Sequence, residues 1–441
     1  MLRALPNDGA ATLLKNGVTA MRILSVILFG IVLASCSRTG GTSLVPTANG
    51  SSLNVPSGSE SSLTRQSSGN HGYKLLYAFN GGTADGEYPY GELTALNGKL
   101  YGMTAGGGAA NGAVFELSRS GKEKVIYAFK GGADGAYPAA GLLAANGVLY
   151  GTTEGGGGGP CAGSPSGCGT VFEVSTSGKE RVLHAFNGAD GAVPIATPVL
   201  MNGKLYGTTQ TGGGTSCASG RGCGTVFELS KSGKERVLHA FTSTPDGANP
   251  YSGLLALNGK LYGTTFEGGT PGFGTVFEVS SSGHERVVYS FLSKGQDGEN
   301  PYAGVIAVNG KLYGTTQAGG TDQIHGTVYE VSLSGKERVL HSFTGGTDGS
   351  YPEGGLFAVA GVLYGTTSGG GLYNSNTCFA SGCGTVFKVT TSGTKSVLYA
   401  FQGGADGKTP YASLIALHDA LYGTTVIGGP LSFGTVFKIL P

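Results

Sequence analysis

Residues 253–291 read G-L-L-A-L-N-G-K-L-Y-G-T-T-F-E-G-G-T-P-G-F-G-T-V-F-E-V-S-S-S-G-H-E-R-V-V-Y-S-F and contain four β-rich runs in succession. The runs cover residues 253–257, 260–265, 274–280 and 284–291. Asn258-Gly259 separates the first two runs and is the dipeptide that best fits a type I′ turn, because both central residues need a positive φ. Ser281-Ser282-Gly283 separates the last two and fits a three-residue hairpin loop with Gly in the left-handed position. The stretch therefore predicts two consecutive β-hairpins, which supply a first, second, third and fourth strand.

Three strings from this stretch recur in fixed order along the chain, seven times each. The string L-Y-G-T-T, or a close variant, has its tyrosine at Tyr101, Tyr150, Tyr206, Tyr262, Tyr313, Tyr364 and Tyr422. The string G-T-V-F, or a variant, begins at Gly112, Gly169, Gly224, Gly274, Gly326, Gly384 and Gly434. The fourth strand ends at Phe79, Phe129, Phe186, Phe241, Phe291, Phe343 and Phe401. Seven copies over residues 73–441 give about 53 residues each, the size of a four-stranded propeller blade of the kelch class.

Burial and closure favour a propeller over an open solenoid. Runs such as V-F-E-V at 276–279 and R-V-L-H-A-F at 181–186 carry apolar side chains on both faces, so both faces must be covered by neighbouring blades. The first recognisable strand, 73–79, has the sequence of a fourth strand, and the last, 433–440, has that of a third strand. Pairing these two removes the open sheet edge. We predict an all-β, seven-bladed propeller of four antiparallel strands per blade, with the last blade closed by the N-terminal strand.

The expected register places opposite charges on the third and fourth strands. Glu278 faces Arg286, and the same offset is found in four other units: Glu116 with Lys124, Glu173 with Arg181, Glu228 with Arg236, and Glu330 with Arg338. Lys388 with Ser396 is an exception. Such a cross-strand pair contributes at most about 1 kcal/mol, so it specifies register more than it stabilises the sheet.

Composition excludes several classes of protein. Gly accounts for 84 of the 441 residues, without the three-residue period of collagen, and 39% of residues are apolar, which argues against disorder. The formal net charge is +1, with no basic run to attract nucleic acid, and there is no Trp for stacking. We expect no nucleic-acid partner and no cofactor, and a monomer.

The N-terminal region resembles a bacterial lipoprotein signal. Residues 21–36 combine a positive charge with an apolar run of about a dozen residues, too short to span a bilayer, and end in L-A-S-C. The resemblance implies cleavage before Cys36 and lipidation of its sulfur, whereas the alternative is an ordinary secretory signal. We therefore expect an exported protein tethered to the cell envelope, with the outer membrane indicated by Ser37. The predicted segments are a mis-assigned start at 1–20, a signal peptide at 21–35, a lipidated Cys with a flexible Ser/Gly linker at 36–72, and the propeller at 73–441.

The other six cysteines fall into three close pairs. They are Cys161 with Cys168, Cys217 with Cys223, and Cys378 with Cys383. An even count after Cys36 is set aside fits three local disulfides formed in an oxidising compartment. Zinc is the alternative, but no His or further Cys lies at ligand spacing beside the pairs, so we expect no metal there.

The strings L-Y-G-T-T-x-G-G, G-T-V-F-E-V-S-x-S-G-K-E-R-V-L and A-F-x-G-x-D-G resemble the GloVer tandem repeat of exported bacterial proteins. The resemblance covers about residues 73–441, and it implies a repeat domain displayed outside the cell with no established catalytic activity. The Gly pair after the second strand is also similar to kelch repeats, although the Trp of kelch units is absent. Kelch is therefore a structural analogy.

The connections between the second and third strands, which we call the B-C loops, are the variable part of the unit. Three of them contain the cysteine pairs, and they share one face of the disc with the loops between blades. Constant scaffolds with variable loops are typical of recognition by repeat proteins, while the alternative is that the disulfides only protect the loops from proteolysis. The candidate binding residues on this loop face are Glu154, Arg221, Glu267, Asp322, His325 and Tyr373.

Two other repeated residues have simple structural explanations. An Asp-Gly pair follows every fourth strand, at Asp85, Asp134, Asp190, Asp246, Asp297, Asp348 and Asp406. These acids fit turns better than a calcium site, which would need several oxygen ligands per unit. His184, His239 and His341 occupy a position that Tyr fills in the other four units, which indicates a packing role.

These patterns predict a lipid-anchored propeller that binds an extracellular glycan or an envelope protein through its loop face. A carbohydrate-active lyase or hydrolase with its site over the central channel is an alternative, since an enzyme needs residues that break the repeat symmetry. No catalytic residue is assigned. An envelope-assembly scaffold is a further alternative, resting on analogy of fold and anchor alone.

Overall fold

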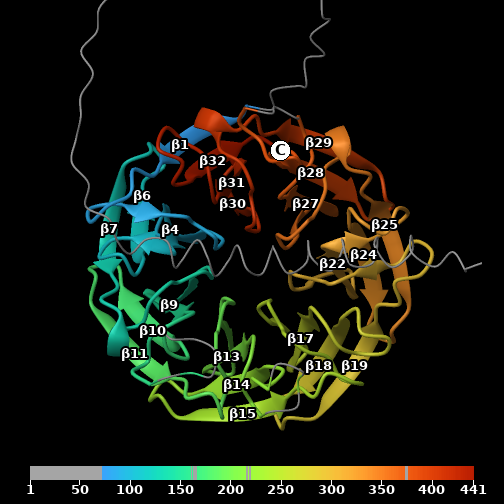
Figure 1. The fold of residues 1–441 in the computed structure, drawn as a ribbon, viewed down its shortest axis with the longest axis horizontal. Coiled ribbons are helices and arrows are strands. Elements are labelled where there is room, and N and C mark those ends of the chain that lie inside the picture. Colours follow the sequence, from blue (N-terminus) through green and yellow to red (C-terminus); the bar gives the residue numbers. More distant parts are fainter. Residues whose placement is uncertain (1–71, 160, 162–165, 215–216, 218–219, 373–375) are drawn as a thin grey trace, which may run out of the picture. The chain divides into compact units, whose positions relative to one another are not determined.

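The computed structural model describes residues 72–159, 161, 166–214, 217, 220–372 and 376–441. Cys36, the signal peptide and the linker lie outside the described residues. Seven four-stranded antiparallel sheets are arranged as blades around an axis, which confirms the predicted seven-bladed propeller (Figure 1). Within each blade the short first strand is nearest the axis and the fourth strand is outermost (Figure 1).

The strands have nearly constant lengths in all seven blades. The inner strands are β3 Thr94–Leu96, β8 Leu143–Ala145, β12 Val199–Met201, β16 Leu255–Leu257, β21 Ile306–Val308, β26 Phe357–Val359 and β30 Ile415–Leu417. The second strands are β4 Lys99–Thr104, β9 Val148–Thr153, β13 Lys204–Thr209, β17 Lys260–Thr265, β22 Lys311–Thr316, β27 Val362–Thr367 and β31 Ala420–Thr425. The third strands are β6 Ala113–Leu117, β10 Thr170–Ser175, β14 Thr225–Leu229, β18 Thr275–Ser280, β24 Thr327–Ser332, β28 Thr385–Thr390 and β32 Thr435–Ile439. The outer strands are β7 Glu123–Ala128, β11 Glu180–Ala185, β15 Glu235–Ala240, β19 Glu285–Ser290, β25 Glu337–Ser342, β29 Lys395–Ala400 and β1 Lys74–Ala78.

Short elements in the connections complete the described secondary structure. They are β2 Gly86–Glu87 paired with β5 Gly106–Gly107, β20 Gly298–Glu299 paired with β23 Ala318–Gly319, and the 3₁₀ turns η1 Gly132–Asp134, η2 Gly346–Asp348 and η3 Gly404–Asp406.

The hairpin turns follow the predicted chemistry. Asn258 and Gly259 have φ values of 52° and 76°, as a type I′ turn requires, and Gly283 has a φ of 97°. The inner strand of this blade starts at Leu255, two residues later than predicted. Gly253 belongs to a contact between blades instead, since a Cβ there would lie 2.9 Å from the carbonyl oxygen of Thr197.

The two ends of the propeller meet in one sheet, as predicted. Strand β1 pairs antiparallel with β32, with Lys74 opposite Lys438 and Ala78 opposite Thr435. We number the blades in chain order, so that blade 1 starts with β3 and blade 7 starts with β30. The ring of Tyr73 stacks on that of Tyr399 in blade 6, with 4.0 Å between ring centroids. Strand β1 thus covers the edge of β32 that would otherwise be unpaired, and it completes the seventh blade as its outer strand.

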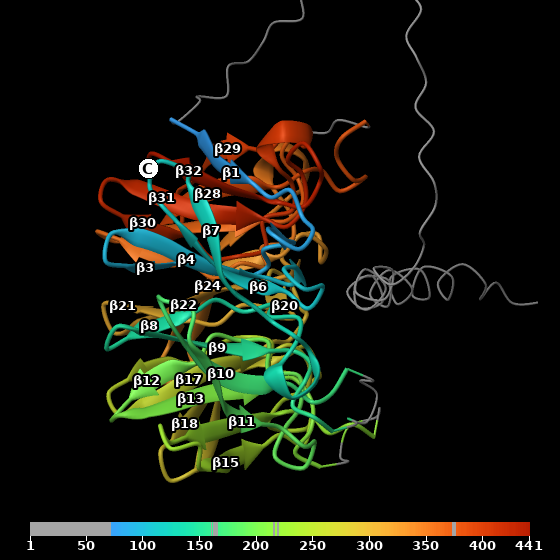
Figure 2. The same cartoon turned by 90° about the vertical axis from the view of Figure 1, so that its left-hand side faces the viewer.

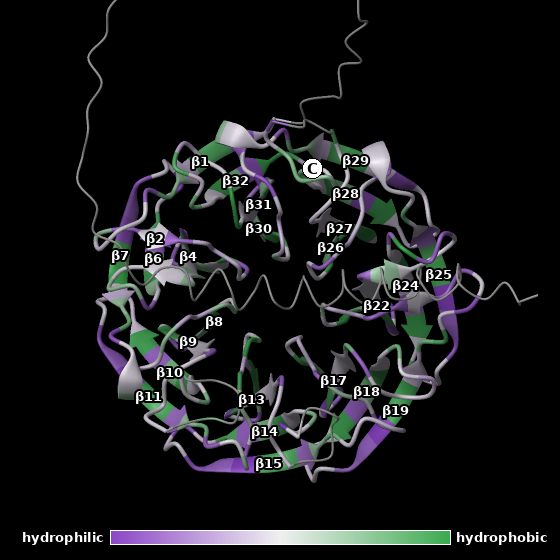
Figure 3. Ribbon diagram, viewed as in Figure 1, coloured by the Kyte–Doolittle hydropathy of each residue, from purple (hydrophilic) through white to green (hydrophobic). Residues whose placement is uncertain are grey.

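The Gly of the L-Y-G-T-T string makes room for an aromatic side chain from the third strand. A Cβ on Gly263 would lie 2.5 Å from Cζ of Phe277, which is fully buried. Phe277 in turn meets Phe241 of the preceding blade edge to face, at 5.1 Å between centroids. All seven blade interfaces contain such a pair, with Tyr329 replacing Phe in one of them. Figure 3 accordingly shows hydrophobic residues in the strands where blades face each other, and hydrophilic residues reappearing on the outer strands.

The threonines of the same string form hydrogen bonds within and between blades. Thr264 donates to the carbonyl of Ala303 in the next blade at 2.9 Å, and Thr265 is 2.8 Å from Thr275 of its own third strand. The same interblade bond recurs in six blades, while Met103 takes the Thr position in the remaining one. The repeated Thr pair is therefore explained by structure.

The predicted cross-strand register is observed in all five charged pairs. Glu278 lies opposite Arg286, whose Nη2 is 3.0 Å from Glu278 Oε2. Lys260 Nζ and the Tyr262 hydroxyl also donate to this carboxylate, at 2.6 and 2.7 Å. These donors hold the pKa of Glu278 at about 2, against the opposing effect of partial burial. The same Arg donates to the carbonyl of Leu333 in the following blade, so the cluster also connects neighbours.

The connections divide between two faces of the disc, with short hairpin turns on one face and the longer loops on the other (Figure 2). Three disulfides close B-C loops, joining Cys161 to Cys168, Cys217 to Cys223 and Cys378 to Cys383. They indicate folding in an oxidising extracellular or periplasmic compartment. Among the residues that the structure describes, no helix is long and apolar enough to cross a membrane.

The Gly263→Ala substitution tests the contact between Gly and Phe277. Its methyl group overpacks the blade, so we expect the free energy of unfolding to fall by about 1–3 kcal/mol. Gly159→Ala is the control, because a Cβ at Gly159 meets no atom within 4 Å. Urea denaturation measures both variants, and equal stabilities for them would contradict this explanation of the repeated Gly.

Candidate functional site

Residues that break the sevenfold symmetry gather where the inner strands begin. One residue directly follows the proline of each interblade loop, and these seven are Tyr90, Ala139, Ile195, Tyr251, Tyr302, Glu353 and Tyr411. A second set directly follows the L-Y-G-T-T string: Ala105, Glu154, Gln210, Phe266, Gln317, Ser368 and Val426. We call Tyr90, Glu154, Tyr251, Tyr302, Glu353 and Tyr411 the axial cluster.

The aromatic residues of the axial cluster form two pairs. Tyr251 and Tyr302 from adjacent blades stack with 4.8 Å between ring centroids and 28° between planes. Phe266 meets both rings edge-on, at 5.1 and 6.0 Å. Tyr90 and Tyr411 form the second pair, with centroids 6.0 Å apart. Burial and neighbouring charges raise the pKa of Tyr90 and Tyr251 to about 12, so these phenols remain protonated hydrogen-bond donors at neutral pH.

Two carboxyl groups lie among these rings. Glu353 is only 7% exposed; its Oε1 accepts a hydrogen bond from Gln317 Nε2, while its Oε2 is buried without a hydrogen-bond partner. Burial raises the pKa of Glu353 to about 7. Burial does the same for Glu154, whose pKa is also about 7. Both carboxyls can therefore donate or accept a proton near neutral pH.

A third carboxyl, Glu92, spans several blades just below the cluster. At the equivalent position the other six blades have Gly, Ser or Thr, among them Gly141 and Gly253. The Glu92 side chain packs against Gly141 of blade 2, where a Cβ would lie 2.4 Å from Glu92 Cγ. Its Oε1 accepts a hydrogen bond from the Thr197 hydroxyl of blade 3 at 2.9 Å. Ser413 of blade 7 also hydrogen-bonds this carboxyl, and burial raises its pKa. Glu92 therefore connects three blades across the axis.

The Asp residues of the interblade loops have a structural role, as the turn interpretation predicted. Asp297 Oδ2 accepts from the Tyr289 hydroxyl of the outer strand at 2.9 Å and from the Leu292 N–H at 2.7 Å. Where His replaces Tyr, His239 Nε2 lies 2.8 Å from Asp246 Oδ2. The His and Tyr side chains are thus equivalent partners of the loop Asp. The sequence pattern predicted a packing role for these His residues but not their hydrogen bond to the loop Asp.

Each of these aspartates lies near the first outer-strand residue of the next blade. In five interfaces that residue is a Glu whose Oε1 is buried without a hydrogen-bond partner: Glu123, Glu180, Glu235, Glu285 and Glu337. Burial and the nearby Asp raise the pKa of these five carboxyls to about 7.

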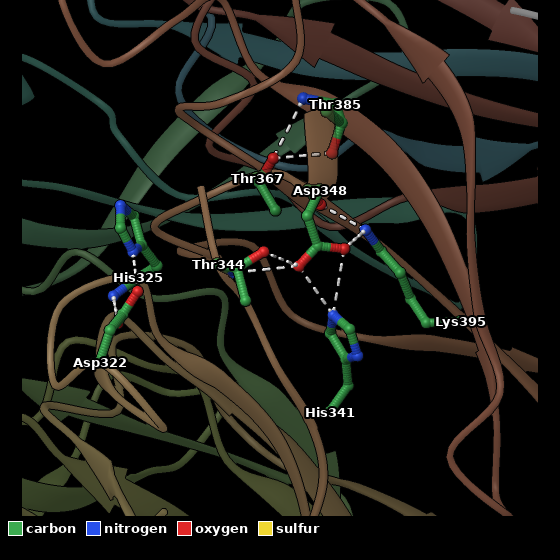
Figure 4. A network of polar contacts seen from close by, with 8 residues as sticks. All are labelled: Asp322, His325, His341, Thr344, Asp348, Thr367, Thr385 and Lys395. Atoms are coloured by element: carbon green, nitrogen blue, oxygen red, sulfur yellow. Dashed lines mark hydrogen bonds and ion pairs between the residues drawn. The ribbon is translucent and has the colours of Figure 1, made fainter. Parts of the chain in front are cut away.

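In the sixth interface Lys395 replaces the Glu. Its Nζ lies 2.6 Å from Asp348 Oδ1, beside His341 and Thr344 (Figure 4). These contacts hold the pKa of Asp348 well below its usual range despite its burial. In the seventh interface the Tyr73 hydroxyl donates to the Asp406 carbonyl at 2.8 Å.

One group of described residues has the donor set of a metal site. His184, Asp190 and Glu235 place one ligand atom each within 4.8 Å of one another. Asp190 already accepts bonds from His184, the Asn187 N–H and the Asn187 side chain. The group is thus one variant of the repeated interblade contact.

The candidate residues from the sequence lie in different parts of the loop face. Glu154 belongs to the axial cluster, and exposed Glu267 is close enough to raise the pKa of Tyr251. Asp322 and His325 pair with each other in a B-C loop, apart from the network around Asp348 (Figure 4). Arg221 lies in the disulfide-closed B-C loop of blade 3, where its backbone carbonyl accepts a hydrogen bond from the Gly212 N–H at 2.7 Å. Tyr373 lies outside the described residues.

Sequence reasoning missed most of the axial cluster, namely Tyr90, Tyr251, Tyr302, Glu353 and Tyr411. A signal for them was present. When the seven units are aligned, the position after the proline varies between Tyr, Glu, Ala and Ile, while the residue before it is always Pro and the residue after it is always small. That variation is a weaker signal than the B-C loops, which differ between units in length as well as in residue type.

The five interblade glutamates predict a pH-dependent stability. The unfolded chain releases these protons at the ordinary pKa of Glu and the folded protein only near pH 7, so the folded state binds more protons between these values. The free energy of unfolding should therefore fall as pH rises from 5 to 8, and Glu154 and Glu353 act in the same direction.

Glu285→Gln should make this fall shallower, because the amide does not titrate. Around Glu285, Asp246 raises its pKa whereas His239 and Arg286 oppose the effect of burial. Urea denaturation at several pH values measures the slope, with exposed Glu267→Gln as the control. A stability that rises from pH 5 to 8, or an unchanged slope in Glu285→Gln, would contradict the assignment.

Comparisons with known proteins match part of the chain to a repeat family. The model of the Gloeobacter/Verrucomicrobia repeat matches residues 161–379, while no curated protein matches. Among solved structures, a puromycin hydrolase mutant is similar with a TM-score of 0.48 and 12% identity, over 81% of this chain and 52% of that one. The chain thus spans about half the length of that hydrolase. A gluconolactonase from Xanthomonas campestris is similar with a TM-score of 0.37 and 12% identity, over 62% of this chain and 79% of that one. The match over residues 161–379 supports the GloVer repeat family that the strings of this chain resemble.

Proposed function

We propose that this protein is an exported binding module that takes an extracellular glycan at the axial cluster, on its loop face. The observation that carries the proposal is the stacked pair Tyr251 and Tyr302 beside Glu353, whose Oε2 has no hydrogen-bond partner. Aromatic rings can stack on the apolar faces of sugar rings, while carboxyl, amide and phenol groups hydrogen-bond the hydroxyls. Gln210 and Gln317 supply amides at the same level of the propeller.

The contrast between repeated and variable residues supports this proposal. Contacts between blades repeat around the ring, whereas the axial cluster has different residues in each blade. Variation confined to one region of a repeat scaffold is typical of a recognition site. The disulfide-closed loops lie on the same face and would extend the contact to a longer glycan or to an envelope protein that carries one.

Catalysis is a second candidate function for the same residues. Two carboxyls have a pKa of about 7, Glu154 and Glu353, and their charges act on the pKa of Tyr90 and Tyr302. Carboxyls tuned in this way can act as general acid or base in glycan cleavage. Cleavage of a bound glycan would identify the protein as a lyase or hydrolase, whereas binding without cleavage would identify it as a binding module.

Tyr302→Ala should weaken binding of an oligosaccharide by about tenfold or more, because it removes half of the stacking pair. The purified protein is first screened on a glycan array, and hits are titrated by calorimetry. Tyr289→Phe, on the outer strand, is the control and should bind normally. Release of new reducing or unsaturated ends by the unmodified protein, lost in Glu353→Gln, would favour the enzyme.

The disulfide-closed B-C loops are tested separately from the axial cluster. Replacement of Cys217 and Cys223 by Ser should leave axial binding intact and reduce affinity only for longer ligands. If loss of the loop contacts abolishes all binding while Tyr302→Ala has no effect, the site lies on the loops and the axial proposal is wrong.

We propose further that Cys36 anchors the protein to the cell envelope through a lipid. Its L-A-S-C context supports this, and the compartment agrees with the three disulfides. The unmodified protein should incorporate labelled fatty acid and partition with membranes, whereas Cys36→Ala should remain unlabelled. Equal labelling of both would contradict the assignment.

A further inference from the structure

The two carboxyls of the axial cluster each lie close to both aromatic pairs. The charge of Glu353 is the main cause of the raised pKa of Tyr411, and it adds to the effect of burial on the pKa of Tyr302 in the other pair. The charge of Glu154 likewise adds to the effect of burial on the pKa of Tyr251 and Tyr90. Carboxyl and aromatic groups therefore alternate within one site.

The cluster has no cation of its own at its defining positions. None of the fourteen residues that follow the interblade prolines or the L-Y-G-T-T strings is Lys or Arg. Buried Asp348, by contrast, is paired with a cation, since Lys395 Nζ lies 2.6 Å from its Oδ1. Glu353 has only neutral neighbours, since Gln317 and Ser368 hydrogen-bond its carboxyl, and its Oε2 is buried without a hydrogen-bond partner. Leaving such a buried oxygen unpaired costs free energy, which a bound donor would recover.

A protonated amine matches this arrangement in three respects. It supplies several N–H donors for the unpartnered Oε2 of Glu353. It supplies the positive charge that neighbouring carboxylates favour. It can also lie against the faces of Tyr rings, which attract cations. A negatively charged sugar would instead be repelled by Glu154 and Glu353.

We propose that the axial cluster recognises an amino sugar, with the protonated amino group of a hexosamine held by Glu353 between the two aromatic pairs. This inference rests on the proposed function and names the ligand class of the same site. Hexosamine hydroxyls would reach the amides of Gln210 and Gln317, while its ring stacks on Tyr251 and Tyr302.

Equal-length oligomers of glucosamine, N-acetylglucosamine and glucose separate this inference from general glycan binding. Calorimetric titration of the purified protein near neutral pH should give the tightest binding for the glucosamine oligomer. Added salt should weaken that binding and leave the two neutral oligomers unaffected.

Glu353→Gln should lower affinity for the glucosamine oligomer by about tenfold or more and affect the neutral oligomers much less, because the amide still hydrogen-bonds hydroxyls but carries no charge. Glu285→Gln is the matched control, because Glu285 is also a carboxyl with an unpartnered oxygen but lies in an outer blade interface. It should bind all three oligomers normally. If Glu353→Gln is too unstable to titrate, Glu154→Gln should show the same selective loss.

The outcomes distinguish the two proposals. If a neutral oligomer binds as tightly as the glucosamine oligomer, or the Gln variants lower all three affinities equally, the amino-sugar inference is wrong and glycan binding stands. If no oligomer binds the unmodified protein, both proposals fail.

Discussion

The antiparallel pairing of β1 with β32 is the constraint on which the rest of the structure depends. Each blade buries apolar side chains on both of its faces, so every blade needs two neighbours. A linear array of seven units would expose one such face at each end. The chain avoids this by placing a fourth strand at the beginning and a third strand at the end, so that blade 7 is assembled from both. Closure also brings Tyr73 onto Tyr399 of blade 6.

Within the closed ring, the repeated residues are used for contacts between neighbours. Phe277 fits over Gly263 and meets Phe241, Thr264 bonds to the next blade, and Arg286 reaches the turn beyond. The interblade carboxyls are part of this pattern, with Lys395 as an exception that forms an ion pair. Residues that look functional when read singly, such as His239 beside Asp246, are thereby explained by their equivalence to Tyr in other blades.

The axis is where this equivalence ends. Seven positions separated by about 53 residues in the chain converge there, and each blade contributes a different side chain. Glu92 shows how the asymmetry is accommodated, since its carboxyl occupies space that Gly141 leaves open and bonds to Thr197. Above it, tyrosines and carboxyls with raised pKa values form the one region of the described structure where symmetry, burial and chemistry all differ from the repeat.

The amino-acid sequence by itself determined the number of blades, the strand order, the register and the disulfide pairs. These depend on local signals, such as Asn258-Gly259 turns, the Glu278 to Arg286 offset and cysteines a few residues apart, which act within a single unit. It also identified Glu154 as a loop-face residue. Only the tertiary structure brought Glu154, Glu353 and four tyrosines into one cluster. Their proximity results from the rotation that relates successive blades around the axis, a property of blade packing that no single unit encodes.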